Sequence, residues 1–314
     1  MKRFPPLLRI VTVNVQDGGT TNPAGIEHVL TQLFAGVEHA PALIIVNEAK
    51  HWLGDGHRLG LRVAAILADI YGPRYQIRVG HMGRAPVPPA LLWDPALLAL
   101  TRWDDPVTSP DNHDMWNRAV FDTAWQGGPL TVMPLHWHPA DREQRISSAR
   151  VLSGLLGGEE LVVAAGDTNC SPSGRTGMWP RTDFERMPAY KRHHKGWQPH
   201  GPSGPWESHT APLDLLLGRA DPDTGDRSGG IGWQSAIEAA WYLRGRPAGE
   251  VFEPTVNPGV DPGGSEVIDH ILLSRRLAAG VVPEETRVHL PQGPPVSDHR
   301  LVSTAVRPEV MARR

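Results

Sequence analysis

The chain has 314 residues, of which 40% are hydrophobic and 21% are charged, with a formal net charge of -3 and a single cysteine, Cys170. This length is sufficient for one large domain or two smaller ones, and one cysteine excludes an intrachain disulfide and argues against a cysteine-based zinc site. The chain also lacks the overall basic excess of many nucleic-acid-binding proteins, so any such binding would depend on a local patch.

The start of the chain does not have the pattern of a secretion signal. Pro5, Pro6 and Arg9 interrupt the apolar stretch that would have to follow the basic residues Lys2 and Arg3. No stretch of the sequence approaches the ~18 consecutive apolar residues of a membrane helix. Together with the lone cysteine, which is compatible with a reducing compartment, these features predict a cytoplasmic protein without a membrane span.

The first 140 residues are predicted to contain strands with two helices between them. Apolar runs rich in β-branched residues indicate strands in residues 7–15, 42–49, 75–80, 89–95, 119–126 and 129–137. Apolar residues at helical spacing indicate helices in residues 24–37 and 56–72, the second closed by Gly72. The Gln-Gly-Gly-Pro break at 126–129 favours a hairpin between the last two strands.

The second half of the chain continues this pattern with one interruption. Helices are predicted in residues 142–158 and 232–243, and strands in residues 160–169, 266–274 and 300–306. Residues from about 171 to 230 have little periodicity and many prolines and glycines, which predicts a loop-rich insertion. We expect a single domain over 1–314, built as a layered α/β or α+β structure from two packed sheets covered by helices.

Polar residues stand at the ends of several predicted strands. They are Asn14, Asn47 with Glu48, His136, Asp167 with Thr168 and Asn169, and, before the last strand, Ser297 with Asp298 and His299. Most could be ordinary turn residues, since Ser, Asn and Asp bond their own backbone. A carboxylate directly after the apolar strand at 42–47 has less structural reason to be there. If these strand ends share one edge, their side chains converge on one site.

The combination of residue types limits the chemistry of such a site. Carboxylates, amides and imidazoles without thiolates suit a hard cation such as Mg²⁺ or Mn²⁺. The sequence has no glycine-rich phosphate loop and no Gly-x-Ser-x-Gly elbow, so we set serine hydrolysis aside. Histidines and an asparagine around a divalent cation suit the hydrolysis of phosphate esters, in which charge on the phosphoryl oxygens must be stabilised.

At this point the sequence resembles the endonuclease/exonuclease/phosphatase superfamily, which has the DNase-I-like fold. The shared motifs occur in order between about residues 9 and 306, as TVNV, VNEA, PLHWHP, GDTN, VIDHILLS and SDHRLV. Each motif is weak alone, and the ordered set is specific. The chain departs from the family in having Asn47 where Gln is usual, and His-Trp-His at 136–138 where His-Leu is usual.

The resemblance implies a four-layered α/β sandwich of two packed, mainly antiparallel sheets flanked by helices, with the site at one end of both sheets. It implies a phosphoesterase that depends on Mg²⁺ or Mn²⁺. The implied metal ligands are Asn14, Glu48 and Asp298. Arg145, at the head of the helix after His136, resembles an arginine of the family that would contact the substrate, although a surface position is an equal alternative.

The resemblance also implies roles for five catalytic residues. Asp167 would orient or deprotonate the attacking water, and Asn169 would hold that water or the phosphate. His299 would contact the scissile phosphate, and Asp269 would orient His299 by accepting its other ring proton. His136 would stabilise the transition state or protonate the leaving oxygen.

The residues that would contact the rest of the substrate are less well defined. Lys50 could reach a phosphate or be a plain surface lysine. The loop YKRHHKGW at 190–197 contributes Lys191, Arg192, Lys195 and Trp197. Such a loop suits a phosphate backbone and a base, but it could equally be a solvated loop that balances nearby acids.

Three other histidines have alternatives of their own. His138 could be an extra ligand or face solvent, two residues beyond His136 on the same strand face. His193 and His194 could form a transition-metal pair, although adjacent strand residues point apart.

The sequence therefore predicts a divalent-metal-dependent nuclease that hydrolyses phosphodiester bonds of DNA or RNA. The alternative is a metal-dependent phosphatase or phosphodiesterase of a lipid or small-molecule phosphate ester. A non-catalytic binding protein on the same fold is a remote alternative, because every expected catalytic side chain is present. The expected partner is nucleic acid or a small phosphate ester, and no obligate protein partner is evident.

Overall fold

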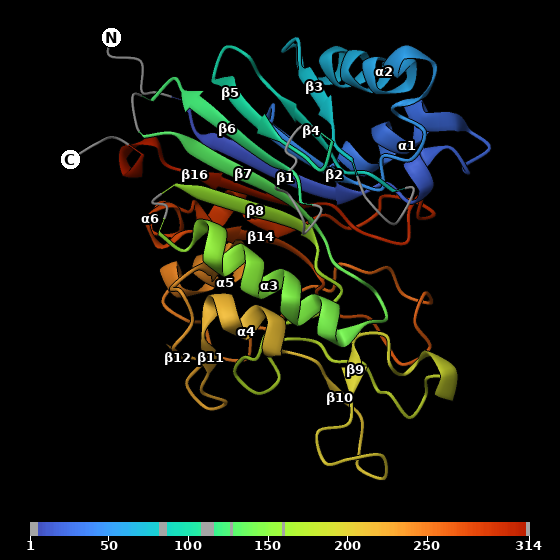
Figure 1. The fold of residues 1–314 in the computed structure, drawn as a ribbon, viewed down its shortest axis with the longest axis vertical. Helices are drawn as coiled ribbons and strands as arrows, with labels where there is room; N and C mark the ends of the chain where they lie inside the picture. Colours follow the sequence, from blue (N-terminus) through green and yellow to red (C-terminus); the bar gives the residue numbers. More distant parts are fainter. Residues whose placement is uncertain (1–5, 82–86, 108–115, 126–127, 159–160, 312–314) are drawn as a thin grey trace.

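The computed structural model describes residues 6–81, 87–107, 116–125, 128–158 and 161–311. These residues form two six-stranded sheets that pack face to face, with helices on both outer surfaces (Figure 1). Each sheet contains one parallel pair of strands, and its other pairs are antiparallel. The four-layered, mainly antiparallel sandwich expected from the sequence is thus confirmed.

The first sheet carries the strands from both ends of the chain. In spatial order it consists of β15 (Arg287–Val288), β16 (Val302–Val306), β1 (Leu8–Asn14), β2 (Leu43–Asn47), β4 (Ala90–Trp93) and β3 (Gln76–Val79). Strands β1 and β2 are the parallel pair. The outer face is covered by α1 (Gly25–Phe34) and α2 (Gly54–Tyr71).

The second sheet has a closely similar arrangement. In spatial order it consists of β13 (Gln234–Ser235), β14 (Asp269–Leu273), β8 (Val162–Asp167), β7 (Leu130–His136), β6 (Arg118–Thr123) and β5 (Leu98–Asp104). Strands β7 and β8 are the parallel pair. Its outer face is covered by α3 (Arg142–Leu156) and α4 (Ala211–Leu217).

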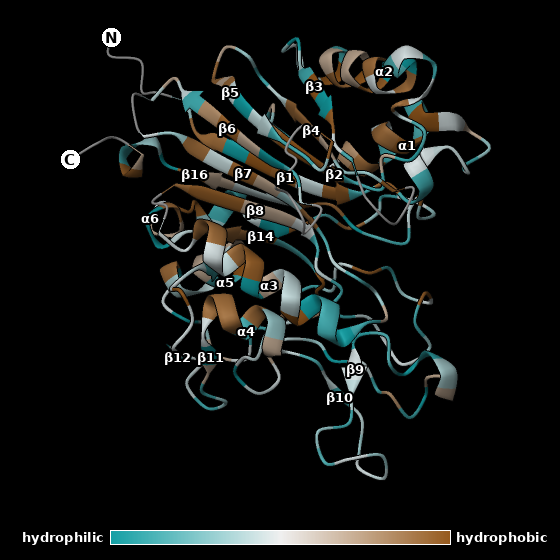
Figure 2. Cartoon of the chain, in the orientation of Figure 1, coloured by the Kyte–Doolittle hydropathy of each residue, from teal (hydrophilic) through white to brown (hydrophobic). Residues whose placement is uncertain are grey.

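Apolar side chains fill the spaces between the layers. In β2, Leu43 and Ile45 point into the core between the sheets, whereas Ile44 and Val46 point toward α1 and α2. Burial on both faces explains why this strand reads as a continuous apolar run. Figure 2 shows the same hydrophobic colour along β1, β7 and β8 in the middle of the molecule. Helix α5 (Ala236–Leu243) adds the buried Trp241 to the core between the sheets.

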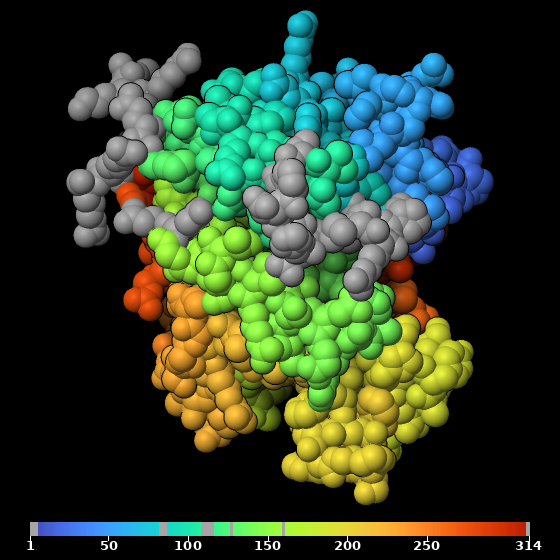
Figure 3. Space-filling view, in the orientation of Figure 1, coloured from blue at the N-terminus to red at the C-terminus, as the bar shows by residue number. Residues whose placement is uncertain are grey.

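The remaining elements are short. They are two two-stranded pairs, β9 (Gly196–Trp197) with β10 (Glu207–Ser208) and β11 (Arg219–Ala220) with β12 (Arg227–Ser228), then α6 (Arg275–Ala278) and the 3-10 turns η1 (Asp17–Gly19), η2 (Ala189–Lys191), η3 (Pro283–Glu285) and η4 (Pro308–Val310). The segment around β9 and β10 projects as a separate lobe in Figure 3. Among the described residues, no helix combines the length and the apolar composition needed to cross a membrane.

Several elements differ from those expected. The segment from 171 to 230 contains α4, which is only seven residues long and therefore too short for a periodic signal. Strand β5 was not predicted, because exposed and partly exposed residues occupy its middle. The helix expected from 232 starts at Ala236, since the preceding residues pair with β14. Strands β6 and β7 are antiparallel as a hairpin requires, but Gln126 and Gly127 of the predicted turn lie outside the described residues.

The strand register brings polar ends to one edge of both sheets. In the first sheet, Asn14 at the end of β1 lies opposite Asn47 at the end of β2. In the second, Asp167 lies opposite His136 on one side and Asp269 on the other. Parallel strands end at the same edge, and antiparallel neighbours begin there. The predicted convergence of strand ends is therefore built into the topology.

Candidate active site

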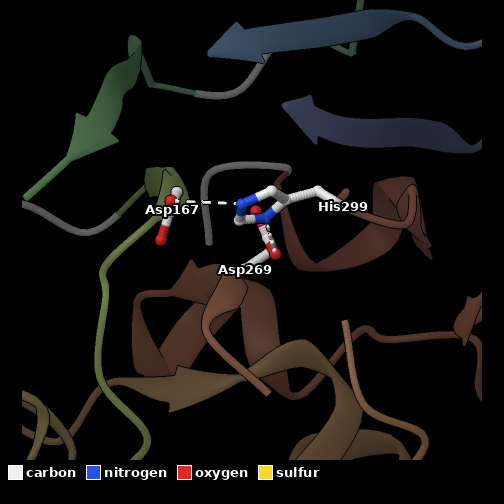
Figure 4. A group of neighbouring side chains, drawn as sticks. All are labelled: Asp167, Asp269 and His299. Carbon is white, nitrogen blue, oxygen red and sulfur yellow. Dashed lines mark hydrogen bonds and ion pairs between the residues drawn. The ribbon is translucent and has the colours of Figure 1, made fainter. Parts of the chain in front are cut away.

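His299 lies between two carboxylates of the second sheet. Its Nδ1 is hydrogen-bonded to Asp269 Oδ2 at 2.8 Å, and its Nε2 is 3.7 Å from Asp167 Oδ2 (Figure 4). All three side chains are buried. The contact with Asp269 fixes the ring, so that Nε2 faces the space in front of Asp167.

Ser297 holds the loop that carries His299. Its hydroxyl donates to the carbonyl of Asn14 at 2.8 Å and accepts from the backbone N–H of His299 at 3.1 Å. Asn257 supports the same loop, because its Nδ2 donates to the carbonyl of Ser297 and its N–H to the carbonyl of Asp298. The serine is thus the turn residue expected from the sequence, and its turn places His299.

Glu48 is the acidic group of the first sheet. Its Oε1 accepts from Asn14 Nδ2 at 3.0 Å, and its Oε2 accepts from the N–H of Asp17 at 2.9 Å. The backbone of Glu48 has a φ of 58°, in the left-handed region that costs a non-glycine residue about 1 kcal/mol or more. These hydrogen bonds hold Glu48 in a strained backbone conformation, and such strain is typical of residues with a function.

His136 lies between the two sheets. Its Nε2 is 3.8 Å from Oε1 of Glu48 on the first sheet and 3.9 Å from Oδ2 of Asp167 on the second. Its Nδ1 is buried and has no hydrogen-bond partner among the described residues. The imidazole therefore joins the acidic groups of both sheets into one cluster.

Asn169 and Asp298 complete the cluster from two loops. The N–H of Asn169 donates to Asp167 Oδ1 at 2.8 Å, and its Nδ2 donates to the carbonyl of Trp137 at 3.0 Å. Asp298 has a side chain that is 33% exposed, with Oδ1 4.0 Å from Nε2 of His299. The Asx turn considered for Asp167 and Asn169 is present and also positions both side chains.

Burial and charge change the protonation of the central pair. Burial raises the pKa of Asp167, partly offset by the attraction of His299 and His136. Burial alone would lower the pKa of His299, but the carboxylates of Asp269 and Asp167 outweigh it and raise the pKa to about 10. In the metal-free protein His299 is therefore an imidazolium at neutral pH, which suits contact with a phosphoryl oxygen.

The charges of the cluster suit a divalent cation. Four carboxylates, Glu48, Asp167, Asp269 and Asp298, gather around two histidines, and no Lys or Arg in the described part of the chain forms an ion pair with them. Ligand atoms of Asp167, Asp269 and His299 lie within 4.8 Å of one another. Hard oxygen donors of this kind fit Mg²⁺ or Mn²⁺.

Asn14 has a different arrangement from that of a simple metal ligand. Its Oδ1 accepts from the N–H of Gln16 at 3.0 Å while its Nδ2 holds Glu48. One lone pair of Oδ1 is therefore already used. Asn14 therefore orients the carboxylate of Glu48, which the sequence predicts to be a metal ligand.

Two residues predicted to contact the substrate have other partners. Nζ of Lys50 lies 2.6 Å from Asp17 Oδ1, next to the backbone that binds Glu48, so this lysine is at the border of the site. Arg145 is fully buried, and its Nη1 donates to the carbonyls of His138 and Pro139 at 2.9 Å. A substrate cannot reach this guanidinium in the structure, which corrects both the substrate contact and the surface position expected for Arg145.

The basic loop at 190–197 is also largely engaged with the protein itself. Lys195 is buried in an ion pair with Asp261, and Arg192 donates to backbone carbonyls of Met187 and Glu185. The ring of Trp197 lies beneath the guanidinium of Arg142, 5.0 Å from the ring centroid. Lys195, Arg192 and Trp197 are thus engaged with the protein itself, and their contact with a substrate stays a prediction. Lys191 is partly exposed at the end of η2.

The other histidines do not join the cluster. His138 Nδ1 accepts from the N–H groups of Ala140 and Asp141, which makes it a turn residue before α3. The rings of His193 and His194 meet edge to face, with their centroids 4.7 Å apart. Sequence reasoning did not assign a role to Asn257, and residues 254–257 show no periodicity or motif that could have indicated one.

The chain is similar to several solved structures over almost its whole length. D. rerio TDP2 in complex with a single-strand DNA product is 16% identical, with a TM-score of 0.56 over 96% of this chain and 99% of that chain. The human Nocturnin catalytic domain with bound sulfate is 13% identical, with a TM-score of 0.55 over 96% and 93%. The 3′ phosphatase NExo from Neisseria bound to a product DNA hairpin is 14% identical, with a TM-score of 0.54 over 95% and 99%.

Comparison of sequences alone gives no such relationship. No protein-family model matches the chain, and no curated protein matches it either. The two packed sheets with their strand order and the similarity to these solved structures indicate the same fold. The chain therefore has the DNase-I-like fold.

Proposed function

We propose that this protein is a divalent-metal-dependent phosphodiesterase that hydrolyses a nucleic-acid strand. The observation that supports it most is the convergence of His299, Asp269 and Asp167 with His136 and Glu48. These five side chains come from both sheets and combine hard oxygen donors with an imidazolium. Both can stabilise the charge that the phosphoryl oxygens gain as water attacks.

Glu48 and Asp298 are the residues that would hold Mg²⁺ or Mn²⁺, with Asn14 holding Glu48 in place. The chemistry that a bound divalent cation supplies is positive charge beside the phosphoryl oxygens. The imidazolium of His299, on the loop before β16, would add a second positive charge and donate a hydrogen bond to the phosphate. Asp269 maintains the orientation and the charge of that ring.

Asp167 would orient the attacking water and accept its proton. Burial raises the pKa of this carboxyl group, which makes it a stronger base than an exposed aspartate. Asn169, fixed by its contacts with Asp167 and Trp137, would hold the water or the phosphate. His136 lies on the Glu48 side of Asp167, where it can stabilise the transition state or protonate the leaving oxygen.

Two structural neighbours support a nucleic-acid substrate. The TDP2 structure contains a single-strand DNA product, and the NExo structure contains a product DNA hairpin. In both, the bound DNA is a product of the reaction rather than only a ligand. Lys50, which pairs with Asp17 at the border of the site, would contact such a strand.

A small phosphate ester is the second candidate, and one observation favours it. Lys195 and Arg192 of the basic loop are bound to the protein itself, and the whole chain carries a formal charge of -3. A polynucleotide substrate would bind with a steep dependence on salt, because phosphate contacts release counterions. A small ester would show a much weaker dependence. Measuring kcat/KM between 50 and 200 mM salt, a range over which nucleic-acid binding typically changes strongly, separates the two.

Cys170 supports a cytoplasmic location, which is part of the proposal. It is the single cysteine of the chain, as is common in reducing compartments. It is buried, and burial raises the pKa of its thiol to about 12, so it is not a nucleophile at neutral pH.

The proposed activity is tested by hydrolysis of single-stranded DNA, duplex DNA, RNA and bis-p-nitrophenyl phosphate with Mg²⁺, Mn²⁺ or EDTA. We expect metal-dependent cleavage by the wild type and by the control variant Arg62→Ala, because the Arg62 side chain on α2 is exposed. Glu48→Gln and His299→Ala should each lose most of the activity. Turnover that persists in EDTA or in both variants would contradict the proposal.

A further inference from the structure

Asn47 connects the two sheets through its side chain. It is the last residue of β2 in the first sheet and is fully buried. Its Nδ2 donates to the backbone carbonyl of Leu135 on β7, and its Oδ1 accepts from the backbone N–H of Asp167 on β8 at 3.1 Å. One carboxamide from the first sheet thus lies at the junction of the two parallel strands of the second.

The two groups that Asn47 binds are partners in a regular parallel ladder. The N–H of Trp137 donates to the carbonyl of Asp167 at 2.9 Å. In an ideal ladder, Asp167 would then donate its own N–H directly to the carbonyl of Leu135. The register of β7 and β8 continues to His136 and Asp167, and the carboxamide of Asn47 bonds this N–H and this carbonyl at the end of the ladder.

Gly166 provides the space for this side chain. It lies opposite Leu135 and has a φ of 141°, which favours glycine. A Cβ at this position would lie 2.0 Å from the carbonyl oxygen of Leu135 and 2.7 Å from Oδ1 of Asn47. A larger residue would therefore displace the Asn47 carboxamide or separate β7 from β8.

The covalent neighbours of these contacts are the residues of the candidate site. Glu48 follows Asn47, His136 follows Leu135, and Asp167 is itself one of the two partners. The separations that these positions determine are 3.8 Å from His136 Nε2 to Glu48 and 3.9 Å from the same atom to Asp167. The apolar core between the sheets is not directional, whereas two buried hydrogen bonds fix one relative position.

We infer that Asn47 is a positioning residue, which sets Glu48 of the first sheet at the correct distance from His136 and Asp167 of the second. Asn47 does not touch substrate, because its side chain is completely covered. Its effect is on the geometry of the reacting groups, so its loss should lower kcat more than it raises KM. The consequences for catalysis rest on the proposed function, while the geometric role can be measured without it.

The test compares Asn47→Leu, which has a similar volume and no hydrogen bonds, with Asn47→Gln, which keeps the carboxamide. Val163→Ala on β8 is the matched control, because it removes buried apolar atoms between the same sheets at a distance from the site. We expect Asn47→Leu to lower kcat by about 10- to 100-fold, as misplacement by about 1 Å can do. KM should change less than about 3-fold, and Asn47→Gln should recover part of the rate.

Gly166→Ala provides a second, independent route to the same defect. If it acts by displacing Asn47, the double variant with Asn47→Leu should be no slower than the slower single variant. A kcat for Asn47→Leu equal to that of the Val163→Ala control would overturn the inference. That result would show that Asn47 only adds to stability.

Two readouts keep this inference separate from the proposed function. Binding of Mn²⁺, measured by electron paramagnetic resonance, should be weakened by about 10-fold in Asn47→Leu and unchanged in Val163→Ala. If the wild type neither hydrolyses an ester nor binds Mn²⁺, the proposed function fails, and crystal structures decide the inference. An unchanged separation between His136 and Glu48 in Asn47→Leu would then refute it, and a shift of about 1 Å would support it.

Discussion

At the level of single residues, His299 differs from an ordinary histidine because its ring lies between two buried carboxylates. The favourable interaction with Asp269 and Asp167 exceeds the cost of burying the imidazolium. The positive charge on this ring therefore depends on the two neighbouring carboxylates. It follows that the role of Asp269 can be measured through the titration of His299.

We expect Asp269→Asn to lower the pKa of His299 from about 10 in the metal-free protein, because the amide keeps a hydrogen-bond acceptor but removes a negative charge. Activity should fall by about 10- to 100-fold, the usual effect of losing such a supporting carboxylate. Titration of the imidazole by NMR checks the first point. An unchanged titration would mean that Asp167 alone sustains the charge.

His270, next to Asp269 on β14, has the opposite behaviour. It is completely buried, and burial lowers its pKa from 6.5 to about 4, although its Nε2 contacts the carbonyls of Cys170 and Val267. At pH values between these two pKa values, His270 is protonated in the unfolded chain and neutral in the folded chain. The stability associated with neutral His270 is therefore complete above pH 6.5 and is lost as the pH falls toward 4.

A His270→Gln variant should consequently lose less stability than the wild type between pH 7 and about 4.5, since glutamine keeps a donor but does not titrate. The quantity to compare is the change in urea midpoint between the two pH values, with exposed His200→Gln as the control. Equal pH-dependence in the wild type and His270→Gln would assign the acid sensitivity to other groups.

The sequence indicated most residues of the cluster because they stand at the ends of predicted strands, whereas Asp269, inside the strand expected over 266–274, came only from the resemblance to a family. Glu48 and Asp167 are recognisable since a carboxylate at the end of a fully apolar strand is unusual. Arg145 and Lys195 could not be assigned in the same way. Their burial depends on tertiary partners, and Asp261 lies 66 residues from Lys195 in the chain.

At the level of elements, α3 begins where the loop after His136 ends. Asp141 caps the helix, with its side chain accepting from the N–H groups of Glu143 at 2.9 Å and Gln144 at 3.1 Å. The cap satisfies two of the N–H groups that have no partner within the helix. It therefore determines where the helix starts relative to the loop that precedes it.

We expect Asp141→Ala to lower the free energy of unfolding by about 1 kcal/mol, the typical loss for an N-cap, and Asp141→Asn to lower it much less. Urea unfolding at neutral pH is the appropriate measurement. If alanine and asparagine were equally destabilising, the loss would come from the charge of Asp141 and not from its hydrogen bonds.

Elements were predicted well where one face or both faces are buried along a long run. The two sheets follow from such runs, and α1, α2 and α3 follow from helical spacing and, for α2, from Gly72, whose φ is 94°. Short elements such as α4 have too few residues for a period to be recognised. Asn47 was noted only as a departure from the family, because a hydrogen bond to the opposite sheet leaves no local pattern.

At the level of the whole molecule, the fold brings negative side chains together at one site, and the histidines there balance only part of their charge. Four carboxylates, from the residue after β2, from β8, from β14 and from the loop before β16, face two imidazoles. Their mutual repulsion destabilises the folded chain when no cation is bound. A cation that binds only the folded state should therefore act as a stabiliser.

We expect Mn²⁺ to raise the Tm of the wild type, with a gain of about 2.7 kcal/mol at a concentration 100-fold above its Kd. Glu48→Gln should abolish most of this gain while leaving the Tm in EDTA nearly unchanged or higher. The measurement is thermal unfolding with Mn²⁺ and with EDTA. If the Tm of the wild type were the same with Mn²⁺ and with EDTA, the assignment of the cluster as a metal site would be contradicted.

The hydrogen bond from Ser297 to Asn14 joins residues that are 283 positions apart, where β16 pairs with β1. A chain in which β16 has not yet paired has Glu48 and Asp167 but no imidazolium beside them, and one edge of β1 is open. Closing a loop of this length costs conformational entropy before the contact can form, so this pairing is expected to be slow. Under the proposed function, hydrolysis would require that the last strand has docked, so an incompletely folded chain should not cleave the phosphodiesters around it.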